Sequence, residues 1–236
     1  MNSEKLSNRL ATVVKYIPKG FKIADIGSDH AYLPCHVVAQ GLVPFAIAGE
    51  VVEGPFQSAK KQVALEGLTE KISVRMGSGL EVISPNEVDC ITIAGMGGAL
   101  IASILDEGKD KLGSVQRLIL QPNLSAKSIR TWLIDHHWEL VGEEILEEDD
   151  KIYEVLIAEK GDPLAPYSNE TLESDLLFGP FLKKQKSETF TKKWLNEKKN
   201  WERILQQIET ASNQGENNPK REELLNKIKM VEEVLN

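Results

Sequence analysis

The sequence predicts an α/β protein built on a doubly wound, mainly parallel sheet of seven strands. Short apolar runs alternate with helix-length stretches along residues 1–160, and this alternation implies parallel strands joined by crossover helices. Glycine and polar clusters follow several of the apolar runs at equivalent points. Such clusters are expected where a ligand binds at the carboxyl edge of a sheet.

The elements follow in a regular order. An amphipathic helix is expected at 4–17, where apolar residues recur at helical spacing before Pro18 and Gly20. Expected strands lie at 22–26, 45–49, 72–75, 88–94, 116–121, 138–146 and 152–159, and further helices at 33–41, 54–66, 98–107 and 125–136. Because a very short segment separates the last two strands, we predict an antiparallel hairpin at the sheet's edge.

A domain boundary is predicted near Gly161, between a ligand-binding domain at 1–160 and a helical C-terminal domain at 161–236. Apolar stripes run from Phe190 to Ala211 and from Leu224 to Leu235, and a turn is predicted at 213–219. Two striped helices joined by a turn predict an α-helical, coiled-coil-like hairpin.

Composition limits the classes of function. The chain has 236 residues, of which 41% are hydrophobic, without a membrane-length apolar run or a signal peptide. We therefore expect a cytoplasmic protein with no membrane association, and Cys35 and Cys90 as reduced, buried thiols. The net charge of −8 argues against indiscriminate nucleic-acid binding, so no DNA partner is expected. Residues 183–199 nevertheless hold seven lysines and two glutamates, which form either an RNA-binding surface or a solvated helix face.

The most informative segment is residues 23–34. Asp25 ends the first strand, and Gly27 and Ser28 form a tight turn whose backbone N–H groups are candidates for ligand binding. Glu50 ends the second strand, where nucleotide-binding α/β folds place an acid that accepts hydrogen bonds from ribose hydroxyls. This pattern predicts a bound adenosine moiety, although Glu50 is alternatively an exposed strand end.

Charge discriminates between two adenosine cofactors. A dinucleotide site needs glycine where this chain has Asp29 and Tyr32, and a carboxylate beside a pyrophosphate costs about 4 kcal/mol at ~4 Å. S-adenosylmethionine has no phosphate and carries a cationic sulfonium and amine, so Asp25 and Asp29 would favour it. Asp29 is alternatively a helix cap. No metal site is expected, because His30 and His36 lack a third ligand at useful spacing.

Further clusters at 76–80, 94–98 and 121–123 follow the third, fourth and fifth strands. Six segments stand out along the chain: DIGSDHAYLP (25–34), AGE (48–50), GPFQSAK (54–60), GSGLEVI (77–83), ITIAGMGG (91–98) and RLILQPN (117–123). In these segments the sequence resembles the bacterial TrmK family of tRNA (adenine-N1)-methyltransferases, which act on adenine 22. The resemblance covers essentially the whole chain.

The resemblance implies a class I (Rossmann-like) methyltransferase fold, S-adenosylmethionine as cofactor and tRNA as substrate, with no obligate protein partner. The implied cofactor-binding residues are Asp25, Gly27, Ser28, Asp29 and His30 on the methionine side, Glu50 and Val51 at the ribose and adenine, Gly77, Ser78, Gly79 and Leu80 at the adenine ring, and Gly95 and Met96 under the methyl group. Family members often carry Asp at the position of Ser78, which makes this contact a departure from the family pattern.

The predicted reaction is in-line transfer of a methyl group to adenine N1, which already has a free lone pair. Asp29 is the candidate for stabilising positive charge or for holding the donor amine, and Gln121 or Asn123 for orienting the base. Lysines of the C-terminal helices would hold the tRNA backbone, and a second basic set on the first helix would extend that surface: Lys5, Arg9, Lys15 and Lys19.

Three other readings remain open at this point: an NAD-dependent oxidoreductase on a Rossmann fold, a non-catalytic RNA-binding protein, and a methyltransferase that acts on a small molecule or a protein. The missing glycine pattern argues against the first, and the intact acidic and glycine clusters argue against the second.

Overall fold

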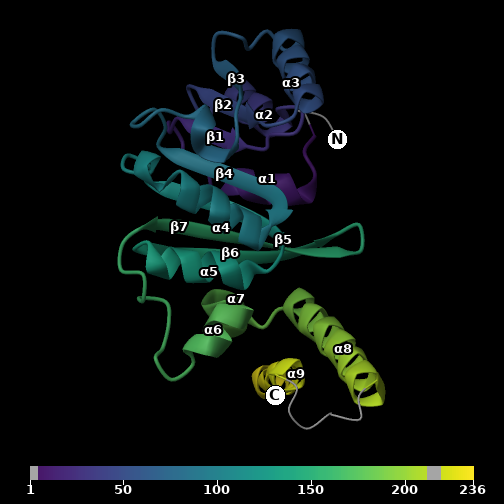
Figure 1. The fold of residues 1–236 in the computed structure, drawn as a ribbon. Coiled ribbons are helices and arrows are strands. Elements are labelled where there is room, and N and C mark those ends of the chain that lie inside the picture. The colour runs from purple at the N-terminus through teal and green to yellow at the C-terminus, as the bar shows by residue number, and fades with distance from the viewer. Residues whose placement is uncertain (1–4, 212–218) are drawn as a thin grey trace. The chain divides into compact units, whose positions relative to one another are not determined.

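The computed structural model describes residues 5–211 and 219–236. The chain divides into two compact units, of which the first ends at Ser168 and the second begins at Asn169. The first unit contains the sheet, and the second consists of helices in its described part (Figure 1). No helix of the described residues is long and apolar enough to cross a membrane.

A seven-stranded sheet forms the centre of the first unit, in the order β3-β2-β1-β4-β5-β7-β6 (Figure 1). The first five strands pair in parallel, and β7 is antiparallel to both β5 and β6. The chain moves outward from β1 to β3 and returns to β4 on the other side of β1. The strands are β1 (Ile23–Ile26), β2 (Ala46–Glu50), β3 (Ile72–Met76), β4 (Cys90–Gly97), β5 (Arg117–Leu124), β6 (Trp138–Glu148) and β7 (Lys151–Lys160).

Helices cover both faces of the sheet. In Figure 1, α4 and α5 lie in front of the sheet, and α1 and α2 lie behind it. All four residues of β1 are buried, as expected for a parallel strand covered on both faces. The helices of this unit are α1 (Asn8–Lys15), α2 (Tyr32–Ala39), α3 (Glu53–Leu65), α4 (Gly98–Glu107) and α5 (Ala126–Asp135).

The α/β prediction is confirmed, because each expected strand and helix of this unit is present. The first helix is shorter than predicted, since Ser7 caps it by accepting the N–H of Leu10 at 3.2 Å; residue 4, its predicted start, lies outside the described residues. The hairpin is also confirmed, with Asp149 and Asp150 alone forming its turn. Both have positive φ, as a type I′ turn requires. Two short 3₁₀ helices were not predicted: η1 (Gly79–Val82) and η2 (Lys109–Lys111).

The second unit contains α6 (Leu172–Phe178), α7 (Pro180–Gln185), α8 (Glu188–Ala211) and α9 (Pro219–Leu235). The predicted hairpin of α8 and α9 is present, and its antiparallel direction follows from two ion pairs. Lys198 Nζ lies 2.6 Å from Glu232, and Arg221 Nε lies 3.3 Å from Glu209. The predicted turn at 213–219 falls almost wholly on residues 212–218, which lie outside the described residues. The sequence did not predict α6 and α7, which are too short to show a periodic pattern.

Candidate active site

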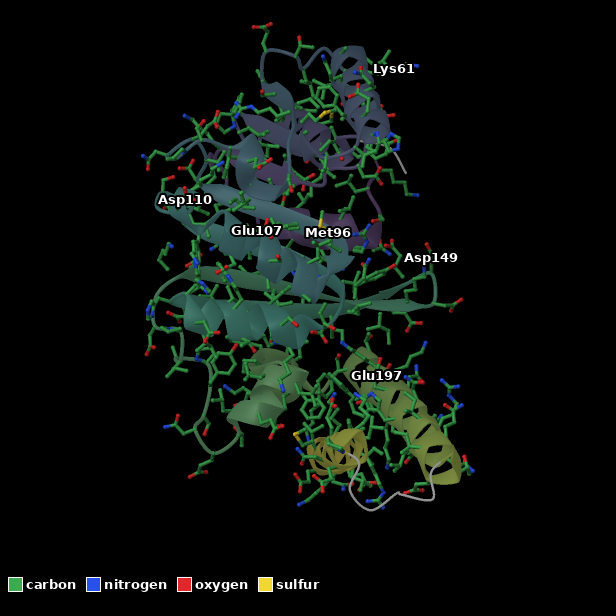
Figure 2. All side chains as sticks on the ribbon, in the orientation of Figure 1. Lys61, Met96, Glu107, Asp110, Asp149 and Glu197 are labelled. Atoms are coloured by element: carbon green, nitrogen blue, oxygen red, sulfur yellow. The ribbon has the colours of Figure 1, made fainter. Side chains whose placement is uncertain are left out.

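The predicted site residues gather at the carboxyl ends of the parallel strands. The strand order reverses between β1 and β4, which is where open α/β sheets bind ligands. In Figure 2, Met96 at the end of β4 lies toward the same side as Asp149 at the hairpin tip. Glu107 and Asp110 lie toward the opposite side.

Asp25 is a buried acid that stabilises the turn after β1. Its side chain is buried, and its two carboxylate oxygens accept hydrogen bonds from the hydroxyls of Ser28 and Thr92, each at 2.6 Å. Burial raises the pKa of Asp25, and the two hydroxyl donors oppose this effect. Because both oxygens are engaged, Asp25 holds the Gly27-Ser28 turn in place rather than presenting a free oxygen to a ligand.

The turn from β1 to α2 has an unusual backbone. Gly27, Asp29, His30 and Ala31 all have positive φ, a conformation that costs most non-glycine residues free energy and that concentrates at functional sites. Glycine avoids strain at position 27, where φ is +69°, and an added Cβ would displace the terminal methyl of Met96.

Asp29 does not cap α2. The N-cap residue of that helix is Ala31, and it makes no side-chain capping bond, so the capping alternative is wrong. The Asp29 side chain is instead 75% exposed, and its Oδ1 lies 3.5 Å from His30 Nε2. The His30 ring stacks on Tyr32 at a centroid distance of 5.4 Å.

The backbone N–H groups of this turn are occupied within the protein. Those of Gly27 and Ser28 donate to the carbonyl oxygen of Gly49 at 2.9 and 3.1 Å, and that of Asp29 donates to Glu50 Oε1 at 2.5 Å. The expectation that Gly27 and Ser28 offer free N–H groups is therefore wrong. A pyrophosphate would have no free N–H groups to bind here and would lie beside the exposed carboxylate of Asp29. A cationic ligand is compatible with this carboxylate.

Glu50 is not an exposed strand end. It is 5% exposed, and burial raises its pKa, while the N–H of Asp29 opposes the shift. The next residue, Val51, is 65% exposed, and Met76 at the end of β3 is 46% exposed. A buried acid beside exposed apolar side chains matches the two parts of adenosine, the ribose hydroxyls and the purine ring.

The predicted adenine-binding segment at 77–80 is constrained by η1. Ser78 forms a capping box with Glu81, in which the Ser78 side chain accepts the Glu81 N–H and the Ser78 N–H donates to the Glu81 carboxylate at 2.9 Å. The Leu80 side chain is only 2% exposed. A ligand at this segment would therefore meet backbone and the rim of the turn rather than the Leu80 side chain.

Gly95 forms a bulge at the end of β4, with φ +81° and a register shift against β5. Its N–H donates to Gln121 Oε1 at 3.0 Å, and its carbonyl oxygen accepts from Asn123 Nδ2 at 2.8 Å. Gln121 is fully buried, and its Nε2 donates to the Pro122 carbonyl oxygen at 2.9 Å. This placement does not fit the prediction that Gln121 contacts the base directly, because its Oε1 holds the bulge and its Nε2 is bonded to Pro122. Asn123 is exposed at the same edge.

Arg9 is a site residue that the sequence did not reveal. It was expected on an RNA-facing surface, but its Nη1 donates to Gln121 Oε1 at 2.6 Å. The two residues are 112 positions apart in the chain, and no local pattern signals such a pairing. Within the described residues, no group of three potential ligands could hold a metal ion.

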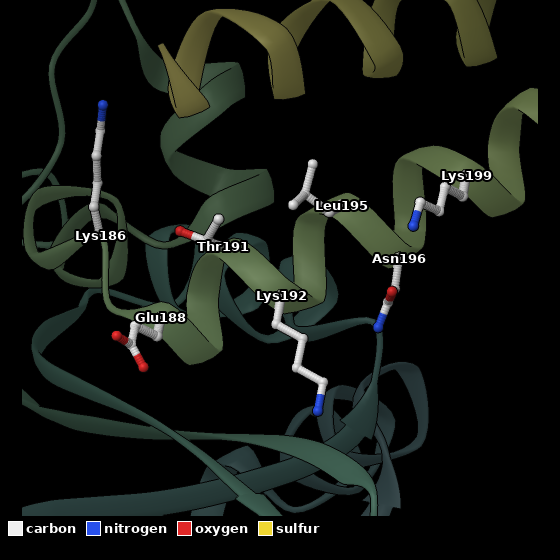
Figure 3. A pocket seen from close by; sticks show the side chains of 7 residues that line it. All are labelled: Lys186, Glu188, Thr191, Lys192, Leu195, Asn196 and Lys199. Carbon is white, nitrogen blue, oxygen red and sulfur yellow. The ribbon is translucent and has the colours of Figure 1, made fainter.

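The second unit has a lysine-rich surface pocket beside α8. In Figure 3, Lys192 and Asn196 extend from one side of the helix, and Leu195 extends from the other. Lys183 does not line this pocket and pairs with the buried Asp175 instead. The pocket is lined by Lys186, Glu188, Thr191, Lys192, Leu195, Asn196 and Lys199.

Comparison with known proteins places the chain in a family. A model of the family described as TrmK, tRNA (adenine(22)-N(1))-methyltransferase, matches residues 23–233. The enzyme of that name from Bacillus subtilis is 53% identical over 235 residues, which cover 100% of this chain and 99% of the relative. This chain belongs to the TrmK family. The crystal structure of Bacillus subtilis TrmK covers 98% of the chain and 99% of its own length, with a TM-score of 0.94 and 52% identity.

A second similar structure contains bound S-adenosyl-L-methionine. It is a putative tRNA methyltransferase of the same specificity from Streptococcus pneumoniae, in complex with S-adenosyl-L-methionine. It is 45% identical, covers 98% of this chain and 100% of its own length, and has a TM-score of 0.87.

Proposed function

We propose that this protein transfers the methyl group of S-adenosylmethionine to N1 of adenine 22 in tRNA. The observation that carries the cofactor assignment is the turn after β1. It offers no phosphate cradle at Gly27, Ser28 and Asp29, because their N–H groups bond within the protein. It presents the exposed carboxylate of Asp29 instead, which suits a phosphate-free cation. The substrate assignment rests on membership of the family.

The residues at the sheet edge fit the parts of the donor. Glu50 accepts hydrogen bonds from the ribose, and Val51 and Met76 flank the adenine, beside the backbone of 77–80. Asp29 is exposed and holds the donor amine, with Ser28 and His30 alongside. The Gly95 bulge and Met96 lie under the reacting methyl group.

When bound, S-adenosylmethionine supplies an electrophilic methyl group, and attack by adenine N1 leaves S-adenosylhomocysteine. No residue needs to remove a proton first, because N1 has a free lone pair at neutral pH. The protein therefore contributes positioning and electrostatics. Asn123 orients the edge of the base, and Gln121 fixes the bulge.

Adenine N1 lies on the Watson–Crick edge, so the enzyme acts on an unpaired or extruded base. Lysines of the second unit bind phosphates of the tRNA, and the pocket beside α8 contributes Lys186, Lys192 and Lys199. We propose the cytoplasm as the compartment in which the protein acts, because its substrate is tRNA.

Mass spectrometry of nucleosides tests this function. An unmodified tRNA transcript incubated with enzyme and S-adenosylmethionine should gain one 1-methyladenosine, and a transcript with guanine in place of adenine 22 should gain none. Failure to methylate the first transcript, in protein that binds the donor, would favour a non-catalytic RNA-binding role. Methylation of both transcripts would contradict the assigned position.

A further inference from the structure

We propose that Arg9 binds the α-carboxylate of the methyl donor. The proposal rests on the proposed function, because it requires S-adenosylmethionine at the carboxyl edge of the sheet. It extends that function by assigning a partner to the one anionic group of the donor.

The guanidinium of Arg9 lies beside the ends of β1 and β4. Its Nη1 donates to Gln121 Oε1, the same oxygen that accepts the N–H of Gly95. A Cβ built on Gly95 would lie 3.4 Å from Arg9 Nη1. Burial raises the pKa of Asp25, and the charge of Arg9 is among the groups that oppose this shift. The cation therefore lies at the point where the strand order reverses, next to the predicted methyl position.

Arg9 has donors to spare. A guanidinium carries five N–H donors in a rigid fork that matches a carboxylate, and the bond to Gln121 uses one nitrogen. Across residues 5–211 and 219–236, no carboxylate lies within ion-pair distance of its guanidinium. The guanidinium carbon lies 5.5 Å from the centre of the Tyr153 ring, which restrains its orientation.

The acidic residues at this edge of the sheet favour the presence of such a cation. Asp29 and Glu50 favour the sulfonium and the amine of the donor, but both of them repel its carboxylate. A guanidinium at the same edge offsets this repulsion and adds directional, charge-assisted hydrogen bonds.

The helix that carries Arg9 is anchored at both ends by the edge strand β6. Glu148 accepts the N–H of Asn8 at 2.5 Å and that of Arg9 at 3.2 Å, which satisfies two donors of the first turn. At the other end, Lys15 Nζ lies 2.7 Å from Glu144. Arg9 is therefore held in place before a ligand arrives, which lowers the entropic cost of binding.

Titration calorimetry with two donors tests the proposal. The probes are S-adenosylmethionine and its decarboxylated form, which lacks only the group in question. Wild-type protein should bind the intact donor about 10- to 100-fold more tightly, as expected for a charge-assisted pair. Arg9→Gln should lose this preference to within about threefold while its affinity for the decarboxylated donor stays near the wild-type value.

Two further variants complete the design. Arg9→Lys keeps the charge without the fork and should retain part of the preference. Lys19→Gln removes an equal charge from an exposed position just beyond α1 and should keep it in full. Thermal unfolding of each variant identifies any loss of folded protein.

The possible failures are distinguishable. If wild-type protein binds neither donor, the proposed function fails and this inference fails with it. If Arg9→Gln weakens both donors equally, Arg9 only supports the fold of the cleft and the inference is overturned. If Arg9→Gln keeps the preference but loses affinity for tRNA, the guanidinium binds an RNA phosphate, which overturns the inference as well.

Discussion

Glu50→Gln is the substitution that most directly separates the role of the buried acid in binding from its cost in stability. Glutamine has nearly the same shape, and its Oε1 can still accept the N–H of Asp29, now 2.5 Å from the carboxylate. The turn from Gly27 to Ala31 should therefore keep its conformation. What disappears is the negative charge that the ribose hydroxyls would contact.

The expected loss follows from the number of hydrogen bonds. A hydrogen bond to a charged group contributes about 1 kcal/mol more than one between neutral groups, and two ribose hydroxyls are available. We expect S-adenosylmethionine binding to weaken by about 2 kcal/mol, or roughly 30-fold in Kd. Titration calorimetry at neutral pH measures this change directly.

The same substitution should stabilise the unliganded protein. Burial raises the pKa of Glu50 above its ordinary value of 4.5, so the folded state holds this proton more tightly than the unfolded state. The stability of wild-type protein therefore falls as the pH rises from 4.5 through the folded-state pKa, and the ionisation penalty is complete above it. Glutamine carries no such penalty.

Urea unfolding across this pH range tests the second half of the prediction. Glu50→Gln should be more stable than wild-type protein at neutral pH, and the difference should vanish below pH 4.5. Asp25 also has a raised pKa, and its charge is one of the causes that raise the pKa of Glu50, so the comparison measures Glu50 together with this coupling. An unchanged donor Kd, or a variant less stable than wild-type at neutral pH, would refute the reasoning.

Three further predictions follow. Gly27→Ala should cost at least about 1–2 kcal/mol of stability through its backbone conformation and should also weaken donor binding in calorimetry by displacing Met96; Gly20→Ala, with positive φ and open space, is the control for backbone strain alone. Arg130→Met should destabilise the protein to urea by about 3–5 kcal/mol, because it leaves two buried glutamates without their counter-charge; a smaller loss would mean that these acids are protonated or solvated. Neutralising the three pocket lysines should weaken tRNA binding in filter assays and flatten its salt dependence without changing donor affinity; these residues are Lys186, Lys192 and Lys199. An unchanged salt slope would show that these lysines do not contact the RNA.

The sheet was predictable because its signals are local. Each buried strand is a short apolar run, and each is followed by turn residues, so the seven strands and the edge hairpin can be placed from sequence alone. The ends of elements depend on less visible contacts, such as the Ser7 cap that delays the first helix. Short helices such as α6 and α7 span too few residues to reveal a period.

The location of the candidate site was predictable from the sequence, but the hydrogen bonds within it were not. Glycine and acidic residues at strand ends identify the cleft, because the carboxyl ends of parallel strands share one edge. Which polar groups face the ligand depends on contacts between distant segments. The side chains of Asp25 and Gln121 form hydrogen bonds within the protein. Arg9 reaches this edge of the sheet from a helix that is distant in the sequence.

Thermal unfolding with S-adenosylmethionine and with NAD, at equal concentrations, tests the central claim that this acidic edge accepts a cation in place of a pyrophosphate. A ligand that binds only the folded state at 100 times its Kd stabilises it by about 2.7 kcal/mol. The account predicts a clear rise in melting temperature with S-adenosylmethionine and no rise with NAD. An equal or larger rise with NAD would contradict it.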